Sequence, residues 1–85
     1  PITVGSEEVD AAKTEAQMRV HEIDPRITIH DFRMVKGPTH TNVIFDAAVP
    51  FDIKESDDDI KAAIRKGILE DTGKTAVVTI DRVHT

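Results

Sequence analysis

The chain has 85 residues, which is enough for one domain with a thin hydrophobic core. It contains no cysteine, so disulfides, thiolate zinc sites and thiol nucleophiles are excluded. The 11 basic and 16 acidic residues give a net charge of −5, and neither tryptophan nor tyrosine is present. This composition argues against nucleic-acid binding, which needs a basic face and aromatic side chains that stack on bases. We expect a single domain over residues 1–85.

The sequence offers no membrane-spanning segment. No stretch approaches the ~20 consecutive apolar residues that a spanning helix requires. Residues 1–6 lack the basic and apolar regions of a signal peptide, so we expect none. The chain is therefore expected to be soluble, and it is compatible with being a piece of a larger protein.

Two helices are predicted, over residues 6–23 and 57–70. Ser6 and Ser56 are placed to cap them, and acidic residues follow in each first turn. An Asp-Pro step ends the first helix, and Gly73 ends the second. Both have apolar residues at helical spacing, as expected for helices that cover a core. The two stripes are Val9, Ala12, Ala16, Val20 and Ile23, then Ile60, Ala63, Ile64, Gly67 and Ile68.

Three strands are predicted, over residues 26–35, 40–49 and 75–83. The short glycine-containing link at residues 36–39 makes the first two an antiparallel hairpin, and Pro50 ends the second. The order α-β-β-α-β predicts an α+β fold, a two-layer ferredoxin-like sandwich with both helices on one face of the sheet. We expect the last strand to return alongside the first.

The first strand predicts a subunit interface. Strict alternation puts Ile27 and Ile29 on one face and His30, Phe32 and Met34 on the other. If the helices cover the first pair, the second face is left with uncovered apolar area, which usually marks an interface. We therefore expect a homodimer.

No catalytic motif is present, so we expect no enzymatic activity. Imidazole and carboxylate groups are good ligands for zinc and related divalent ions. His30 lies within the first strand, His40 begins the second, and Asp46 lies on the same face as His40. The alternatives are a hydrogen-bonded core or interface histidine, an exposed turn residue and a solvated acid, respectively.

One segment carries a resemblance. The run His-Asp-Phe-Arg at residues 30–33, a Gly-Pro-Thr turn at 37–39 and a hydrophobic strand closed by Val49-Pro50 resemble the cytoplasmic C-terminal domain of cation diffusion facilitator transporters. That resemblance implies a metallochaperone-like α-β-β-α-β fold that dimerises below the membrane domain of a divalent-metal exporter. It also implies zinc binding near the dimer interface, which draws the two domains together.

Only part of the family's metal site has a match. His30 matches the family's histidine in its His-Asp-Leu-Arg strand. The second-strand histidine falls on Phe45, and the last-strand histidine and acid fall near Ile80 and Arg82. Either shifted groups bind the metal or the domain mainly dimerises. The groups available for a shifted site are Asp31, His40, Asp46, Asp81 and His84.

The resulting prediction is a dimerisation and metal-sensing domain on the cytoplasmic side of a metal-efflux transporter. Its expected partners are a second copy, the transporter's membrane domain and divalent cations, zinc above all, with no nucleic acid. The predicted metal ligands are His30, Asp31, His40 and Asp46, with His30 the strongest candidate. The alternative is a free-standing ferredoxin-like module that binds metal or a small ligand.

Overall fold

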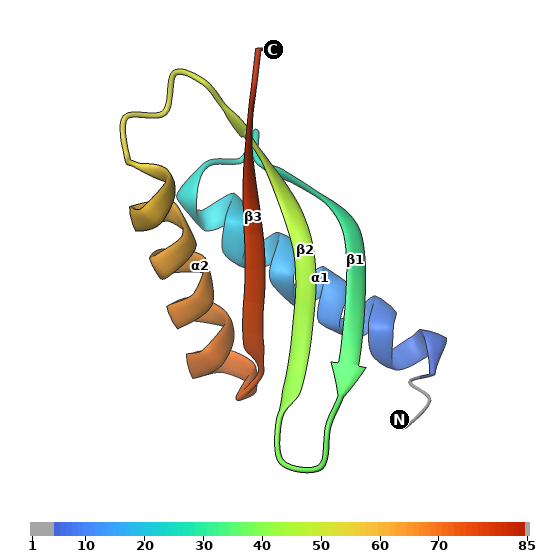
Figure 1. Cartoon of the computed structure of the whole chain (residues 1–85). Coiled ribbons are helices and arrows are strands. Elements are labelled where there is room, and N and C mark those ends of the chain that lie inside the picture. The colour runs from blue at the N-terminus through green and yellow to red at the C-terminus, as the bar shows by residue number, and fades with distance from the viewer. Residues whose placement is uncertain (1–4, 85) are drawn as a thin grey trace.

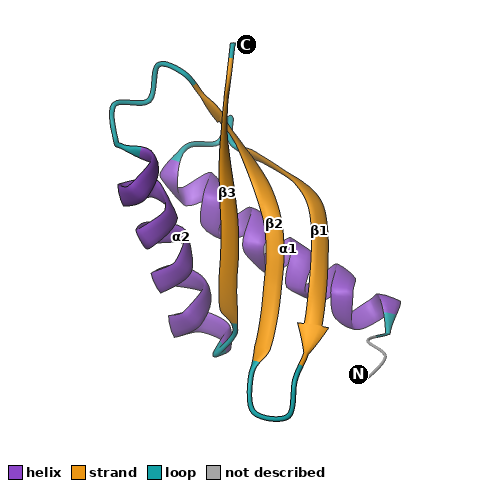
Figure 2. Ribbon diagram, in the orientation of Figure 1, coloured by secondary structure: helices purple, strands orange, loops and turns teal. Residues whose placement is uncertain are grey.

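The structure is a computed structural model that describes residues 5–84. Both helices pack on one face of a three-stranded sheet, in the predicted order α-β-β-α-β (Figure 1). The two-layer, ferredoxin-like α+β fold is thereby confirmed, with helices in one layer and strands in the other (Figure 2). The elements are α1 (Ser6–Ile23), β1 (Thr28–Lys36), β2 (Thr41–Pro50), α2 (Asp57–Thr72) and β3 (Thr75–Val83).

The strand order is β1-β2-β3. β1 and β2 form the predicted antiparallel hairpin, and β3 pairs with β2 in parallel. The prediction that β3 lies alongside β1 is wrong. A crossover through a helix brings the next strand in parallel to the one it left, and the free side of β2 accepts such a strand directly.

The ends of α2 follow the predicted capping chemistry. The Asp59 backbone N–H donates to Ser56 Oγ at 3.1 Å, and Gly73 ends the helix in the left-handed conformation, with φ 72°. The predicted bounds of α1, residues 6–23, are confirmed, but its predicted cap is wrong by one residue, because Gly5 is the N-cap and Ser6 is already helical. At the other end of α1 the Asp24 carboxylate accepts hydrogen bonds from the Arg26 guanidinium and backbone N–H, which lower the pKa of Asp24.

The hydrophobic core lies between the sheet and the two helices. It is wholly apolar, since no polar or charged residue within 5–84 is buried. The predicted helix stripes supply Ala12, Ala16, Val20, Ile60, Ile64 and Ile68, and the sheet side supplies Ile27, Ile29, Val43, Phe45, Ala47, Val49, Ala76 and Val78.

A β-bulge in β1 overturns the predicted interface. His30 pairs with Asp46 and Arg33 pairs with Ile44, so two residues of β1 stand opposite one residue of β2. Asp31 absorbs the extra residue in the left-handed conformation, with φ 53°. Because the extra residue reverses the alternation, the side chains after it change face.

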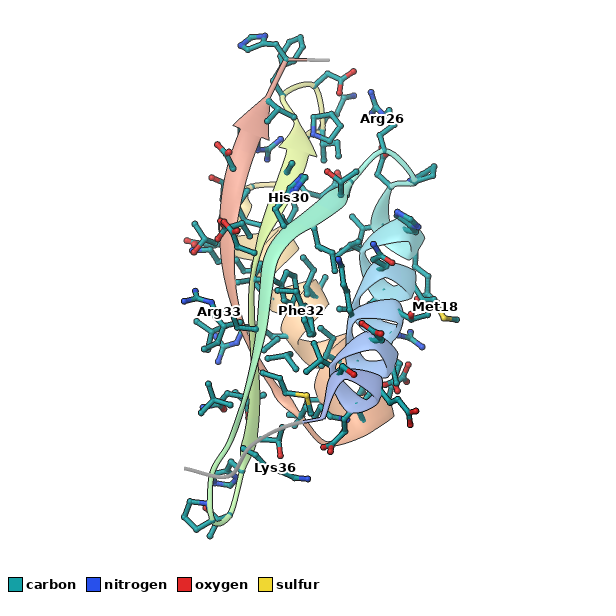
Figure 3. The ribbon with its side chains drawn as sticks, turned by 90° about the vertical axis from the view of Figure 1, so that its right-hand side faces the viewer. Met18, Arg26, His30, Phe32, Arg33 and Lys36 are labelled. Atoms are coloured by element: carbon teal, nitrogen blue, oxygen red, sulfur yellow. The ribbon has the colours of Figure 1, made fainter. Side chains whose placement is uncertain are left out.

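Phe32 and Met34 consequently pack against the core, on the same side as Ile29. The Phe32 ring stacks on Phe45 with 5.8 Å between ring centroids. Figure 3 shows Phe32 directed toward α1 and Arg33 directed away from the helices. The predicted apolar face of His30, Phe32 and Met34 therefore does not exist, because His30 alone remains on the side away from the helices.

The bulge gives a prediction about Asp31. Left-handed backbone is free of steric cost for glycine and worst for a β-branched residue. Asp31→Val should therefore be less stable than Asp31→Gly by about 1–2 kcal/mol. Urea unfolding of both variants measures this difference. Equal stability would show that the backbone at this exposed position is not left-handed.

Arg82 holds the loop between β2 and α2. Its Nη1 donates to the carbonyl oxygens of Pro50 and Ile53, each at 3.0 Å, and its Nη2 donates to that of Glu55 at 2.6 Å. Its Nε donates to the Asp57 carboxylate at 2.8 Å. A planar guanidinium has the several fixed donors that this arrangement requires. One side chain of β3 thus fixes both the loop and the first turn of α2.

Arg82→Ala should lower the free energy of unfolding by about 1–3 kcal/mol, because it removes several hydrogen bonds from a charged donor to the carbonyl groups of the loop. Arg82→Lys should recover little of this loss, since a single ammonium cannot reach all the acceptors. Urea unfolding provides the measurement, with Arg65→Ala as the control for loss of an exposed arginine. Full recovery in the lysine variant would show that charge alone matters.

Candidate functional site

The sheet face that the helices leave uncovered is the candidate site. We call it the open face. It displays those side chains of each strand that alternate with the buried ones. Its members are Thr28, His30, Arg33 and Val35 of β1, Asn42, Ile44, Asp46 and Ala48 of β2, and Val77, Thr79 and Asp81 of β3.

His30 and Asp46 meet at the centre of the open face. They are direct cross-strand partners, and Thr79 of β3 stands on the other side of Asp46. The exposed His30 ring interacts through Nε2 with Thr28 Oγ1 at 2.9 Å. This contact orients the imidazole and leaves Nδ1 free for another partner. The register thus places an imidazole and a half-buried carboxylate opposite each other on neighbouring strands, and both are groups that can bind a divalent cation.

The structure separates the other two predicted ligands from this pair. Asp31 lies next to it along the chain but in the bulge. His40 is not the first residue of β2 but lies in the hairpin turn, where its carbonyl accepts the Gly37 N–H at 2.8 Å. Asp46 lies five positions beyond His40's neighbour Thr41, which is about 17 Å along the strand. Within one chain His40 cannot share a metal with His30.

Apart from His30, the positions matched through the family resemblance face away from the open face. Phe45 is buried in the core, Ile80 packs against it, and Arg82 holds the β2–α2 loop. Their neighbours Asp46, Thr79 and Asp81 are the residues that share a face with His30. The sequence identified Asp46 and Asp81 as candidates for a shifted site, but which candidates face His30 depends on the pairing register. The sequence carries one signal for the bulge, which is Asp31 within the first strand. Aspartate tolerates left-handed backbone better than most residues other than glycine.

The described part of one chain does not assemble a full set of metal ligands. Within residues 5–84, no three histidine or acidic side chains lie close enough together to bind one ion. The open face supplies His30 and Asp46 as neighbours, with Asp81 near them on β3 opposite Ala48. The remaining histidine of the predicted set, His84, stacks on Phe51 with 4.5 Å between ring centroids, at the far end of β3.

Comparison with protein-family models, curated proteins and solved structures gave no match to the chain. The resemblance to cation diffusion facilitators therefore rests on its motifs alone and stays a prediction. No helix within residues 5–84 has the length and apolar character needed to cross a membrane.

Proposed function

We propose that this domain dimerises through its open face in response to a divalent cation, as the cytoplasmic C-terminal domain of a cation diffusion facilitator transporter. The observation that carries the proposal is the cross-strand pair His30–Asp46 at the centre of a sheet face that no helix covers. The resemblance of residues 29–50 to that family supplies the transporter context and the cytoplasmic location.

Apolar groups around the pair support a protein interface. Val35 and Val77 are 49% and 50% exposed, and Ile44 lies half-buried between them on the central strand. The two valines belong to opposite edges of the sheet, so apolar area extends across all three strands. A second open face would bury this area and exclude water from the charged groups beside it.

Two copies also complete the metal site. A two-fold axis through the open face would bring a second His30 and Asp46 toward the first pair, which makes four donors from two incomplete sets. Zinc commonly takes four such ligands. The interface would be isologous, so the same residues of each copy supply all four ligands.

The negative charge of the domain gives a bound cation an effect on dimerisation. Each chain carries a net charge of −5, and the open face contributes Asp46 and Asp81 against the single cation Arg33. Bringing two such faces together costs repulsion, which divalent cations offset. Cations that bind better between the faces than to one face shift the equilibrium toward the dimer by that difference in affinity.

The metal site is tested by calorimetric titration of the domain with zinc. His30→Ala should weaken zinc binding about tenfold or more, because methyl replaces an imidazole ligand. His40→Ala is the matched control and should leave the affinity unchanged, since the turn lies far from the pair. Equal titration curves for the wild type and His30→Ala would contradict the proposed site.

The interface is tested by sedimentation equilibrium with and without zinc. Ile44→Lys should shift the domain toward monomer under both conditions, since it places a charge at the centre of the interface. Met18→Lys is the control, because Met18 is 58% exposed on α1, away from the open face. Dimers that survive Ile44→Lys but not Met18→Lys would assign the interface to the helical layer.

A further inference from the structure

The outer edge of β3 forms a groove with α2. Among residues 5–84, β3 is the last strand of the sheet and pairs with β2 on one side only. Two hollows of about 340 and 290 Å³ lie along this edge and share Arg65, Thr75 and Ala76 in their walls. We call their union the β3 groove; it is lined by Lys61, Ala62, Arg65, Lys66 and Leu69 of α2 and by residues 75–78 of β3.

The β3 groove is basic on an acidic protein. Lys61, Arg65 and Lys66 line it, whereas no acidic residue does. None of the three takes part in an ion pair within residues 5–84. Three free cations side by side on a chain of net charge −5 make a local site for anionic groups.

The groove also has an apolar floor. Leu69 is 54% exposed, and Ala62 and Ala76 line the larger hollow beside it. An exposed leucine in a concave wall offers a place for an aliphatic side chain. The groove therefore combines contacts for carboxylates with a contact for one apolar group.

The strand itself is open to pairing. In a parallel pair, alternate residues of an edge strand direct their backbone N–H and C=O groups away from the neighbouring strand. Residues 75–80, with the sequence Thr-Ala-Val-Val-Thr-Ile, are uncharged and mostly β-branched. Edge strands that avoid further pairing usually carry charges or proline, and this segment carries neither.

We infer that the β3 groove binds an extended acidic segment of another protein, which adds to the sheet as a fourth strand beside β3. Backbone hydrogen bonds to β3 would hold the segment, as in other cases of strand addition. Its carboxylates would meet Lys61, Arg65 and Lys66, and one aliphatic side chain would contact Leu69. The inference concerns a surface separate from the His30–Asp46 pair and does not depend on the metal site.

A second copy of this chain is a poorer occupant. Two β3 edges paired with each other would bring two sets of Lys61, Arg65 and Lys66 together, and like charges would oppose the contact. An acidic segment bound in the groove would instead be attracted to these three side chains. Charge complementarity therefore favours a different partner of opposite sign.

The experiment titrates the ¹⁵N-labelled domain with a synthetic blocked peptide that alternates valine and glutamate. Backbone amides of β3 should shift and exchange with solvent about fivefold more slowly, while those of β1 stay unchanged. Arg65→Glu should weaken the binding about tenfold, and Lys13→Glu, on α1, less than about twofold. The corresponding valine–lysine peptide should bind Arg65→Glu more tightly than it binds the wild type.

Slower amide exchange confined to β3, together with the reversed peptide preference of Arg65→Glu, would establish the site. Three results would overturn it: no slowing of β3 amide exchange, equal weakening by Arg65→Glu and Lys13→Glu, or edge-to-edge dimers in sedimentation that compete with the peptide. Ile44→Lys should bind the peptide as the monomeric wild-type domain does, since the substitution lies outside the groove. Peptide binding that is retained in a variant unable to dimerise would show that the groove does not need the dimer.

Discussion

The left-handed backbone at Asp31 decides which side chains of β1 face the core. Without the extra residue, alternation would send Arg33 and Val35 under the helices and expose Phe32 and Met34. A left-handed non-glycine residue costs about 1–2 kcal/mol. Burying a large apolar side chain stabilises by about 1.5–3 kcal/mol when complete. Partial burial of two such side chains is enough to offset the bulge.

The same bulge sets the composition of the open face. It falls immediately after His30, so His30 keeps its place opposite Asp46 while the aromatic side chain that follows turns into the core. The face is left polar around His30 and Asp46 and apolar nearer the hairpin turn, where Val35, Ile44 and Val77 lie. A β1 strand without the bulge would have placed Phe32 and Met34 on the open face, beside the imidazole of His30. Such a face would expose more apolar area but would have fewer groups able to bind a cation.

Much of the fold could be predicted from local signals. The Ser56 cap, the Gly73 stop and the apolar stripe at Ile60, Ile64 and Ile68 placed α2 to within two residues, because each acts over one or two helical turns. The hairpin followed from its short link. The position of β3 could not be predicted in the same way, since it depends on which edge of β2 or β1 a distant strand meets.

The site was harder to predict than the fold, for a related reason. Alternation along one strand is reliable only while the register holds, and a single extra residue reverses it. His30 and Asp46 were both identified as candidates, yet their direct pairing follows only from the register of the two strands. His40 illustrates the converse. Its chemistry suits a ligand, but the turn places it far from the other donors.

The two proposed surfaces meet at β3, where Val77 lines the β3 groove and also displays its side chain on the open face. A fourth strand beside β3 would widen the sheet, and its alternate side chains would extend the open face past Val77. If two open faces pack together, each added strand would increase the area that the dimer buries. By linkage, dimerisation would then strengthen binding of the acidic segment by the same factor that the segment strengthens dimerisation.

The sign of this coupling depends on the side chains that the bound segment adds to the open face. Aliphatic side chains would favour the dimer, whereas further carboxylates would add to the repulsion between two chains that each carry a net charge of −5. A cation at His30 and Asp46 acts on the same equilibrium, so metal and peptide would be coupled through the dimer without touching each other.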